Sequence, residues 1–243
     1  MKNAIVILML ITHCSVVVLA QDKKEKSQLK YELGMTSGYF HAGGNFVKND
    51  YSNITSGYSN SNGFSYGIEG NLRFRCSLGI AVVVSNTSFY SKGLQTMADG
   101  YKEDFDVDSV TLKATGKYSF TNFLIGPTYQ ATLFARYQFD LRILGGLVCA
   151  KTPKYKVDLE DQAAATFYQN SASVNALGFQ AGIGVSRQVL KRIALKAGVD
   201  YYCTMPNFTI TNENRTNNAG RILTNYHQPI SGFMASLNVI YLF

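Results

Sequence analysis

The feature that most constrains this chain is a two-residue alternation of apolar and polar side chains that returns in segment after segment. Phe64, Tyr66 and Ile68 alternate with Ser65, Gly67 and Glu69, and later segments repeat the pattern. Successive side chains of a β-strand point to opposite faces, so this period predicts strands with one apolar and one polar face. We expect eight strands, near residues 29–42, 63–75, 78–91, 117–133, 138–150, 173–189, 192–207 and 228–243.

The composition agrees with a chain built of strands and turns. The sequence holds 16 Tyr, 15 Phe and 21 Gly, and only 16% of its residues are charged. Aromatic residues are frequent in strands, and an average soluble domain is roughly 25% charged. Such a composition excludes a disordered chain. The net charge of +7 is not gathered into a stripe, so the sequence gives no support to nucleic-acid binding.

The connections between the expected strands alternate between long and short. Residues 43–62, 92–116, 151–172 and 208–227 form long polar connections, whereas only a few residues join the other strand pairs. An even number of strands, with long loops on one rim and tight turns on the other, is typical of barrels in bacterial outer membranes. The chain after residue 20 has no apolar run of roughly 18 residues, the length that a membrane-spanning helix needs.

Two kinds of barrel fit this alternation, because a water-soluble barrel places its bulky face inside and a membrane barrel places it outside. The polar face is rich in Gly and Ser, which suits a crowded interior, and the apolar face continues to the last residue. We therefore predict an all-β fold, an eight-stranded antiparallel up-and-down transmembrane β-barrel embedded in a lipid bilayer. Seven apolar side chains should then face outward: Phe64, Ile68, Phe123, Ile143, Phe179, Val199 and Val239.

The first residues have the pattern of an export signal. Lys2 precedes an apolar stretch, and Val18-Leu19-Ala20 resembles a cleavage site with small residues. We expect residues 1–20 to be a signal peptide of the Sec pathway, 21–28 a short periplasmic lead and 29–243 the outer-membrane barrel.

The end of the chain carries apolar side chains at alternate positions and a final aromatic residue, namely Leu237, Val239, Tyr241 and Phe243. This ending resembles the C-terminal strand signal of outer-membrane proteins. Together with Phe123-Leu-Ile-Gly-Pro-Thr-Tyr129 and residues 177–202, it resembles the small outer-membrane β-barrel domain family, which includes the barrel of outer membrane protein A and opacity-type proteins. The resemblance implies an outer-membrane location and, through the final Phe, assembly by the barrel assembly machinery. It implies no single activity, because this family hosts adhesins, lipid-active enzymes, narrow channels and structural barrels.

Seven charged residues fall on the polar face of their strands: Glu32, Glu69, Arg73, Asp140, Arg142, Lys196 and Asp200. The interior of an eight-stranded barrel is just wide enough for side chains, and a lone charge there is costly. We therefore expect these charges to pair, with Glu32–Arg73 as the most plausible contact and Arg142, Lys196 or a loop cation as the partner of Glu69. The network either plugs the lumen or lines a gated solute path.

The sequence predicts no catalytic, cofactor or metal site. Gly182-x-Gly184 lacks the third glycine of a dinucleotide-binding motif and reads as small residues facing the interior. The long connections hold aromatic residues that either anchor recognition or simply pack: Phe46, Tyr51, Tyr58, Tyr101, Phe105, Tyr155, Phe167 and Tyr168. The expected function is a non-catalytic barrel with a filled lumen, whose loops serve surface interaction with an unnamed ligand or envelope integrity. The alternatives are a small outer-membrane channel and a lipid-modifying barrel enzyme.

Overall fold

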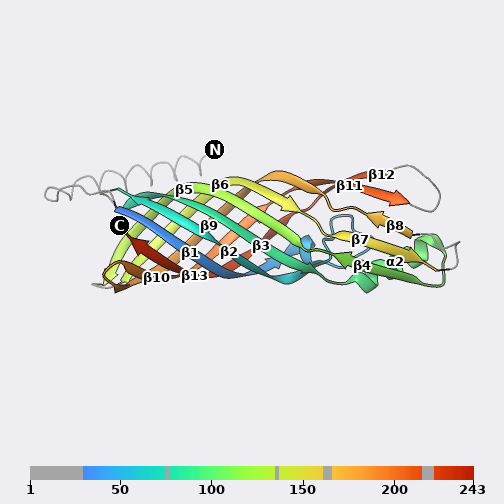
Figure 1. The fold of residues 1–243 in the computed structure, drawn as a ribbon, viewed down its shortest axis with the longest axis horizontal. Helices are drawn as coiled ribbons and strands as arrows, with labels where there is room; N and C mark the ends of the chain where they lie inside the picture. The colour runs from blue at the N-terminus through green and yellow to red at the C-terminus, as the bar shows by residue number, and fades with distance from the viewer. Residues whose placement is uncertain (1–29, 75–76, 135–136, 161–165, 215–221) are drawn as a thin grey trace, which may run out of the picture.

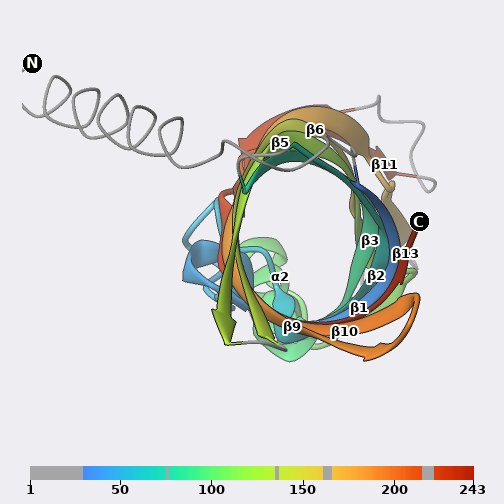
Figure 2. The same ribbon diagram turned by 90° about the vertical axis from the view of Figure 1, so that its left-hand side faces the viewer.

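The computed structural model describes residues 30–74, 77–134, 137–160, 166–214 and 222–243, so the expected signal peptide and lead lie outside the described residues. Eight antiparallel strands form a closed barrel in the order β1-β13-β10-β9-β6-β5-β3-β2 (Figures 1 and 2). They are β1 Lys30–Gly43, β2 Ser59–Arg73, β3 Leu78–Ser91, β5 Tyr118–Phe134, β6 Tyr137–Lys151, β9 Ser173–Leu190, β10 Ile193–Thr204 and β13 Ile230–Leu242. The predicted fold class is therefore confirmed, and the largest boundary error is in β2, which begins at Ser59 rather than at residue 63.

The two ends of the barrel differ. The short connections, the start of β1 and the end of β13 lie at one end, which we call the turn end, and the long connections leave from the other, the loop end (Figure 1). The first and last strands pair from Glu32–Leu242 to Gly43–Ser231, and this seam closes the barrel.

Bulky apolar side chains cover the outer face of the barrel. The seven residues predicted to face outward are 43% to 56% exposed, which confirms their direction. Exposed aromatic side chains gather near both rims of this belt: Tyr31, Tyr129, Tyr137 and Tyr241 toward the turn end, and Tyr39, Phe64, Tyr66, Tyr201 and Phe233 toward the loop end. Paired aromatic girdles around an apolar band are typical of barrels that sit in a lipid bilayer.

The long connections are more ordered than expected. Five further strands form a second sheet in the order β12-β11-β8-β7-β4, and each directly precedes or follows a barrel strand. They are β4 Val110–Thr115, β7 Lys154–Leu159, β8 Thr166–Gln169, β11 Asn207–Asn214 and β12 Ile222–His227. The expectation of polar loops is wrong here, because the alternation continues in these segments. In β7, buried Tyr155, Val157 and Leu159 alternate with the charged residues Lys154, Lys156 and Asp158.

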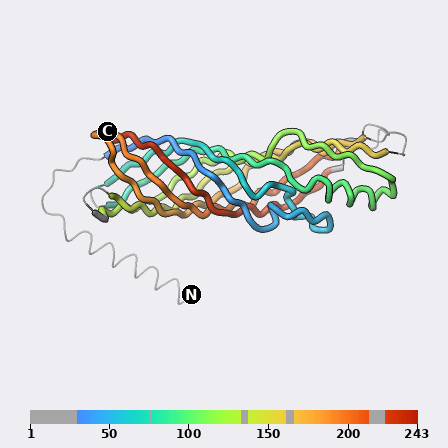
Figure 3. Tube along the Cα trace, turned by 90° about the horizontal axis from the view of Figure 1, so that it is seen from below, coloured from blue at the N-terminus to red at the C-terminus, as the bar shows by residue number. Residues whose placement is uncertain are grey.

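A short 3-10 helix and an α-helix complete the loop end. The 3-10 helix η1 spans Gly44–Val47, and α2 spans Leu94–Phe105. Tyr101 of α2 packs against a cluster of Val107, Val157 and Leu159, and the Tyr51 hydroxyl donates to Asp104. We call η1, α2 and the second sheet the loop-side cap, which continues the long axis of the barrel (Figure 3). In the part of the chain that the structure describes, no helix has both the length and the apolar character needed to span a membrane.

Candidate functional site

The candidate site is the interior of the barrel, and its turn-end half is centred on Arg142 of β6. The Arg142 guanidinium donates from Nε and Nη2 to both carboxylate oxygens of Asp200 on β10, at 2.7 Å each. Its Nη1 lies 2.5 Å from Oε2 of Glu69 on β2. Two-pronged arginine–carboxylate contacts are among the strongest and most directional hydrogen bonds in proteins. One arginine thus connects three strands across the lumen.

Lys196 extends this arrangement. Its Nζ lies 2.9 Å from Oε1 of Glu69 and 2.8 Å from Oδ1 of Asp140. Side-chain amides add further donors: Asn71 Nδ2 to Glu69 at 2.9 Å, and Gln130 Nε2 to Asp140 at 3.1 Å. The five charged residues Glu69, Asp140, Arg142, Lys196 and Asp200 are each at most 4% exposed. Buried charges are tolerated only when paired and hydrogen-bonded, and here every carboxylate meets a cation.

Gly182 makes the Arg142–Asp200 contact possible. Strand β9 lies between β6 and β10, and Gly182 is the register partner of Arg142 on one side and of Asp200 on the other. A Cβ atom at position 182 would lie 1.8 Å from Asp200 Oδ1. The arginine therefore reaches across β9 because this position has no side chain. The glycine pair in Gly182-x-Gly184 accordingly lies in an interior strand, as small residues facing the lumen.

Glu32 and Arg73 form a separate pair nearer the turn end. Arg73 Nη2 contacts Glu32 Oε1, and its Nη1 donates to Gln138 Oε1 at 3.1 Å. Both charged residues line a vestibule of about 920 Å³ that is bordered by Lys30, Gln138, Ser186, Arg187 and Lys191. The described part of the barrel thus has a wide hollow at its turn end, and this ion pair lies at the inner limit of the hollow.

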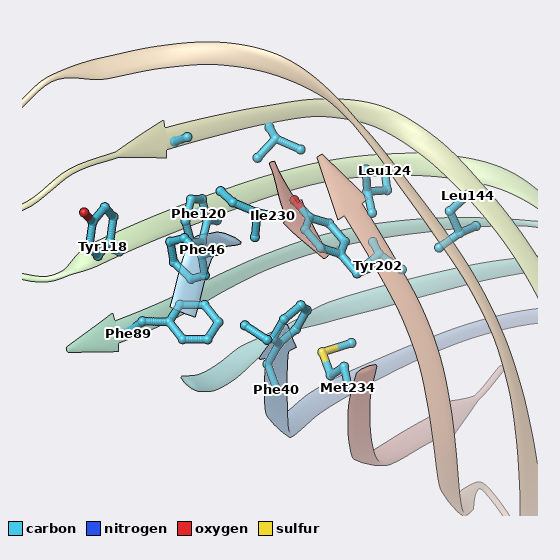
Figure 4. Close-up of a cluster of buried hydrophobic side chains, with 14 of the residues drawn as sticks. Phe40, Phe46, Phe89, Tyr118, Phe120, Leu124, Leu144, Tyr202, Ile230 and Met234 are labelled. Carbon is cyan, nitrogen blue, oxygen red and sulfur yellow. The ribbon is translucent and has the colours of Figure 1, made fainter. Parts of the chain in front are cut away.

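The loop-end half of the lumen is filled by apolar side chains (Figure 4). Phe40 and Phe89 meet edge to face with ring centroids 5.4 Å apart, and Phe46 stacks on Phe89 at 5.2 Å and on Tyr118 at 5.2 Å. Edge-to-face contacts of this kind stabilise beyond the burial of apolar area. Phe46 belongs to η1 and is 0% exposed, so the first long connection folds back into the mouth of the barrel and fills it.

The cavity that remains inside the loop-end half is very small. A cavity of about 10 Å³ lies among Phe40, Asn122, Gln180 and Tyr202, which is room for one water molecule at most. Along β10 the vestibule reaches Ala194, the charged network follows at Lys196 and Asp200, and the small cavity begins at Tyr202. The charged network therefore separates the vestibule from the loop-end half.

The structure places all seven charged residues singled out in the sequence inside the barrel, five in one network and two in the Glu32–Arg73 pair. The apolar half was not foreseen. Phe40, Leu124, Leu144 and Tyr202 lie on the same strand faces as the interior charges, and they are buried rather than facing lipid. The sequence shows that these bulky residues share the parity of the interior charges, but it does not show the height at which they meet.

Aromatic residues of the long connections mainly pack inside the cap. Phe46, Tyr58 and Tyr155 are buried, and Tyr101 and Phe167 pack on the cluster beneath α2. The alternation in β7 and the insertion of η1 explain this packing. The C-terminal residues Leu237, Val239 and Tyr241 on β13 point outward and are exposed, and Phe243, which follows the strand, is exposed as well. Among the described residues, no group of His, Cys, Asp and Glu side chains has an arrangement that would hold a metal ion.

No protein-family model matches this sequence, and the comparison with curated proteins gives no match. Several solved structures align with most of this chain. Neisserial surface protein A is 14% identical with a TM-score of 0.41, and the alignment covers 90% of this chain and 100% of that one. The attachment invasion locus protein Ail of Yersinia pestis is 11% identical with a TM-score of 0.45, and the alignment covers 89% of this chain and 99% of that one. A major outer membrane protein from Thermus thermophilus is 13% identical with a TM-score of 0.46, and the alignment covers 88% of this chain and 99% of that one. The fold of the present chain rests on its own strand pairing, which is that of a small eight-stranded barrel.

Proposed function

We propose that this chain is a non-catalytic barrel of the bacterial outer membrane, closed to solutes by its own side chains. The observation that supports this most strongly is the series arrangement inside the lumen. A fully buried charge network closes the lumen beyond the turn-end vestibule, and a packed aromatic cluster fills the loop-end half. A solute would have to displace both.

The proposed orientation places the turn end in the periplasm and the loop-side cap outside the cell. Long connections on the outer side and short turns on the periplasmic side are the rule for such barrels. The outward C-terminal residues on β13 are the part that we propose the barrel assembly machinery recognises after Sec export. The cap would present an ordered polar surface for contact with an extracellular partner or for envelope integrity.

Conductance tests the closed lumen. The full protein, folded in detergent and inserted into planar bilayers, should give no stable single-channel steps, whereas a gated path would produce them. Insertion is checked by heat-modifiable gel mobility, which a folded membrane barrel shows and a periplasmic barrel does not.

The series arrangement makes a sharper test possible. Arg142→Ser loosens only the charged half and Phe46→Ala only the aromatic half, so each single variant should stay near the wild-type conductance. The combined variant should conduct, because both obstacles are then removed. Steps in either single variant would show that one half alone closes the lumen. A mass shift of lipid A on expression of the wild type would contradict the non-catalytic assignment.

A further inference from the structure

A groove of about 930 Å³ lies on the outside of the barrel where β2, β3, β5 and β6 approach the loop end. Its lower wall is aromatic and includes Phe64 and Tyr66, which are 56% and 55% exposed. Its upper wall carries Lys117 and Lys151 together with the hydroxyls of Ser88 and Ser119. The groove thus changes from apolar to cationic over its own height.

The strand register shows how this change is built. Phe64 pairs with Ser88, Ser88 pairs with Ser119, and Ser119 pairs with Lys151, so one row across four strands runs from an apolar to a charged side chain. On β5, outward Ile125 and Phe123 are followed toward the loop end by Thr121 and Ser119, and Lys117 directly precedes the strand. The groove therefore lies at the height where the apolar belt of the barrel ends.

The two lysines form an uncompensated cationic pair. Lys117 stands two residues before Ser119 on the same strand face, which makes it a diagonal neighbour of Lys151 with Cβ atoms roughly 7–8 Å apart. The Lys117 ammonium lies 4.0 Å from the centre of the Tyr90 ring, a cation–π contact that holds it over the groove. None of the described residues that line the groove is acidic.

We propose that this groove binds the phosphorylated headgroup of a membrane lipid in the leaflet on the loop side. The phosphate would lie between Lys117 and Lys151 and accept hydrogen bonds from the serine hydroxyls, while the acyl chains run along Phe64 and Tyr66. Charge-assisted hydrogen bonds from two ammonium groups favour phosphate over a neutral headgroup.

The geometry favours a lipid over a soluble anion because the cationic wall continues directly into the apolar belt. A lipid in that leaflet presents an anion above hydrocarbon at the same height on this face. The cationic character also continues upward onto the outer face of the cap, where Lys113 and Lys156 are direct register partners. Like charges directly opposite one another destabilise a sheet, and Asp158 offsets one of these two through its ion pair with Lys156.

The test compares wild type with K117Q/K151Q and with K102Q/K191Q, which removes the same charge from α2 and from the β9–β10 turn, outside the groove. Each protein is folded in detergent micelles, checked by heat-modifiable mobility, and titrated with diphosphorylated lipid A or with the same lipid after enzymatic dephosphorylation. Native mass spectrometry counts the lipids that each protein retains.

Wild type and K102Q/K191Q should retain the phosphorylated lipid with about tenfold preference, and K117Q/K151Q should lose most of that preference. Equal retention of both lipids by wild type, or an unchanged preference in K117Q/K151Q, would overturn the proposal. A preference for soluble dextran sulfate that depends on the two lysines, without any lipid preference, would also overturn it and assign the groove to an extracellular polyanion.

The inference rests on the proposed location in a bilayer. Failure of that location and failure of the lipid site give different experimental results. A wrong location would appear as wild-type protein that does not insert into lipid vesicles. A wrong site would appear as inserted protein that shows no preference for phosphate.

Discussion

Charged side chains occupy one half of the lumen and apolar side chains fill the other, although the same strands supply both sets. Strand β10 contributes Lys196 and Asp200 to the turn-end half and Tyr202 to the loop-end half, and β6 contributes Arg142 and then Leu144. In the charged half each group depends on particular partners, because an unpaired buried charge is costly. In the aromatic half burial of apolar area dominates, so a residue of similar volume can replace another at modest cost. A narrow lumen can therefore be filled by specific ion pairs or by adaptable apolar packing. The packed half should tolerate substitutions better than the paired half.

The largest effect is expected for Arg142→Ala. The change leaves Lys196 as the only cation on Glu69 and leaves Asp200 without its guanidinium. Breaking a buried ion pair costs about 3–5 kcal/mol of unfolding free energy. Urea unfolding in lipid vesicles, followed by gel mobility, measures the loss. The double variant Arg142→Met/Asp200→Asn should recover part of this stability, because the Asp200 carboxylate, which would otherwise be buried without a cation, is then neutral. A loss below about 1 kcal/mol for Arg142→Ala would remove the proposed contrast between the halves.

Phe46→Ala tests the aromatic half and is expected to cost about 3 kcal/mol, near the lower end for truncation of a buried Phe. The matched change Phe46→Leu should cost less than about 1.5 kcal/mol, because leucine keeps most of the volume. The same vesicle unfolding assay compares the two variants. If Phe46→Leu were as damaging as Phe46→Ala, the aromatic half would be as specific as the charged half.

Gly182→Ala should cost about 1–3 kcal/mol, because the new methyl group meets the Asp200 carboxylate and pushes it away from Arg142. Gly70 offers a control on another barrel strand, since a Cβ atom there meets nothing within 4 Å. Gly70→Ala should therefore leave the unfolding midpoint unchanged or slightly raised. Equal effects of the two substitutions would show that strand propensity, rather than the contact across β9, explains the loss.

The smallest effect concerns pH and is confined to the loop-side cap. Burial, followed by the negative charge of Asp50, raises the pKa of the Tyr58 phenol from 10.0 to about 12. The stabilising contribution of the neutral phenol is therefore complete below pH 10 and is lost as the pH rises toward 12. Hydrogen exchange should detect loosening around Tyr58 in this window while the barrel amides stay protected. Tyr58→Phe should reduce this pH dependence. An unchanged dependence in that variant would assign it to Tyr101 or Tyr155, because burial raises the pKa of these phenols as well.

The sequence predicted the eight barrel strands because lipid outside and a crowded interior inside impose the same alternation along every spanning segment. The sequence did not reveal the two halves of the interior. Alternation along a strand shows which face a residue occupies, but not which residues of other strands lie at the same height. Phe40 and Leu124 have the parity of Glu32 and Thr128, and only the three-dimensional register shows that the bulky members meet at one height. The role of Gly182 depends equally on register, since Arg142 and Asp200 are far from it in sequence. The ordered cap was missed because its strands, such as β7, are short and lie between polar turns.

The seam between β1 and β13 has a consequence for when the chain can fold. Strands β1 and β13 are the two barrel strands farthest apart in sequence, and their pairing places Glu32 beside Leu242. Contacts between such distant segments make folding slow, because the chain must be brought together over its full length before they form. The ring cannot be completed while the last residues are missing. A chain truncated before β13 would then keep an open edge on β10 and another on β1, and such edges invite pairing with other molecules. Closure of the barrel therefore has to wait for β13, the barrel strand farthest from β1 in sequence.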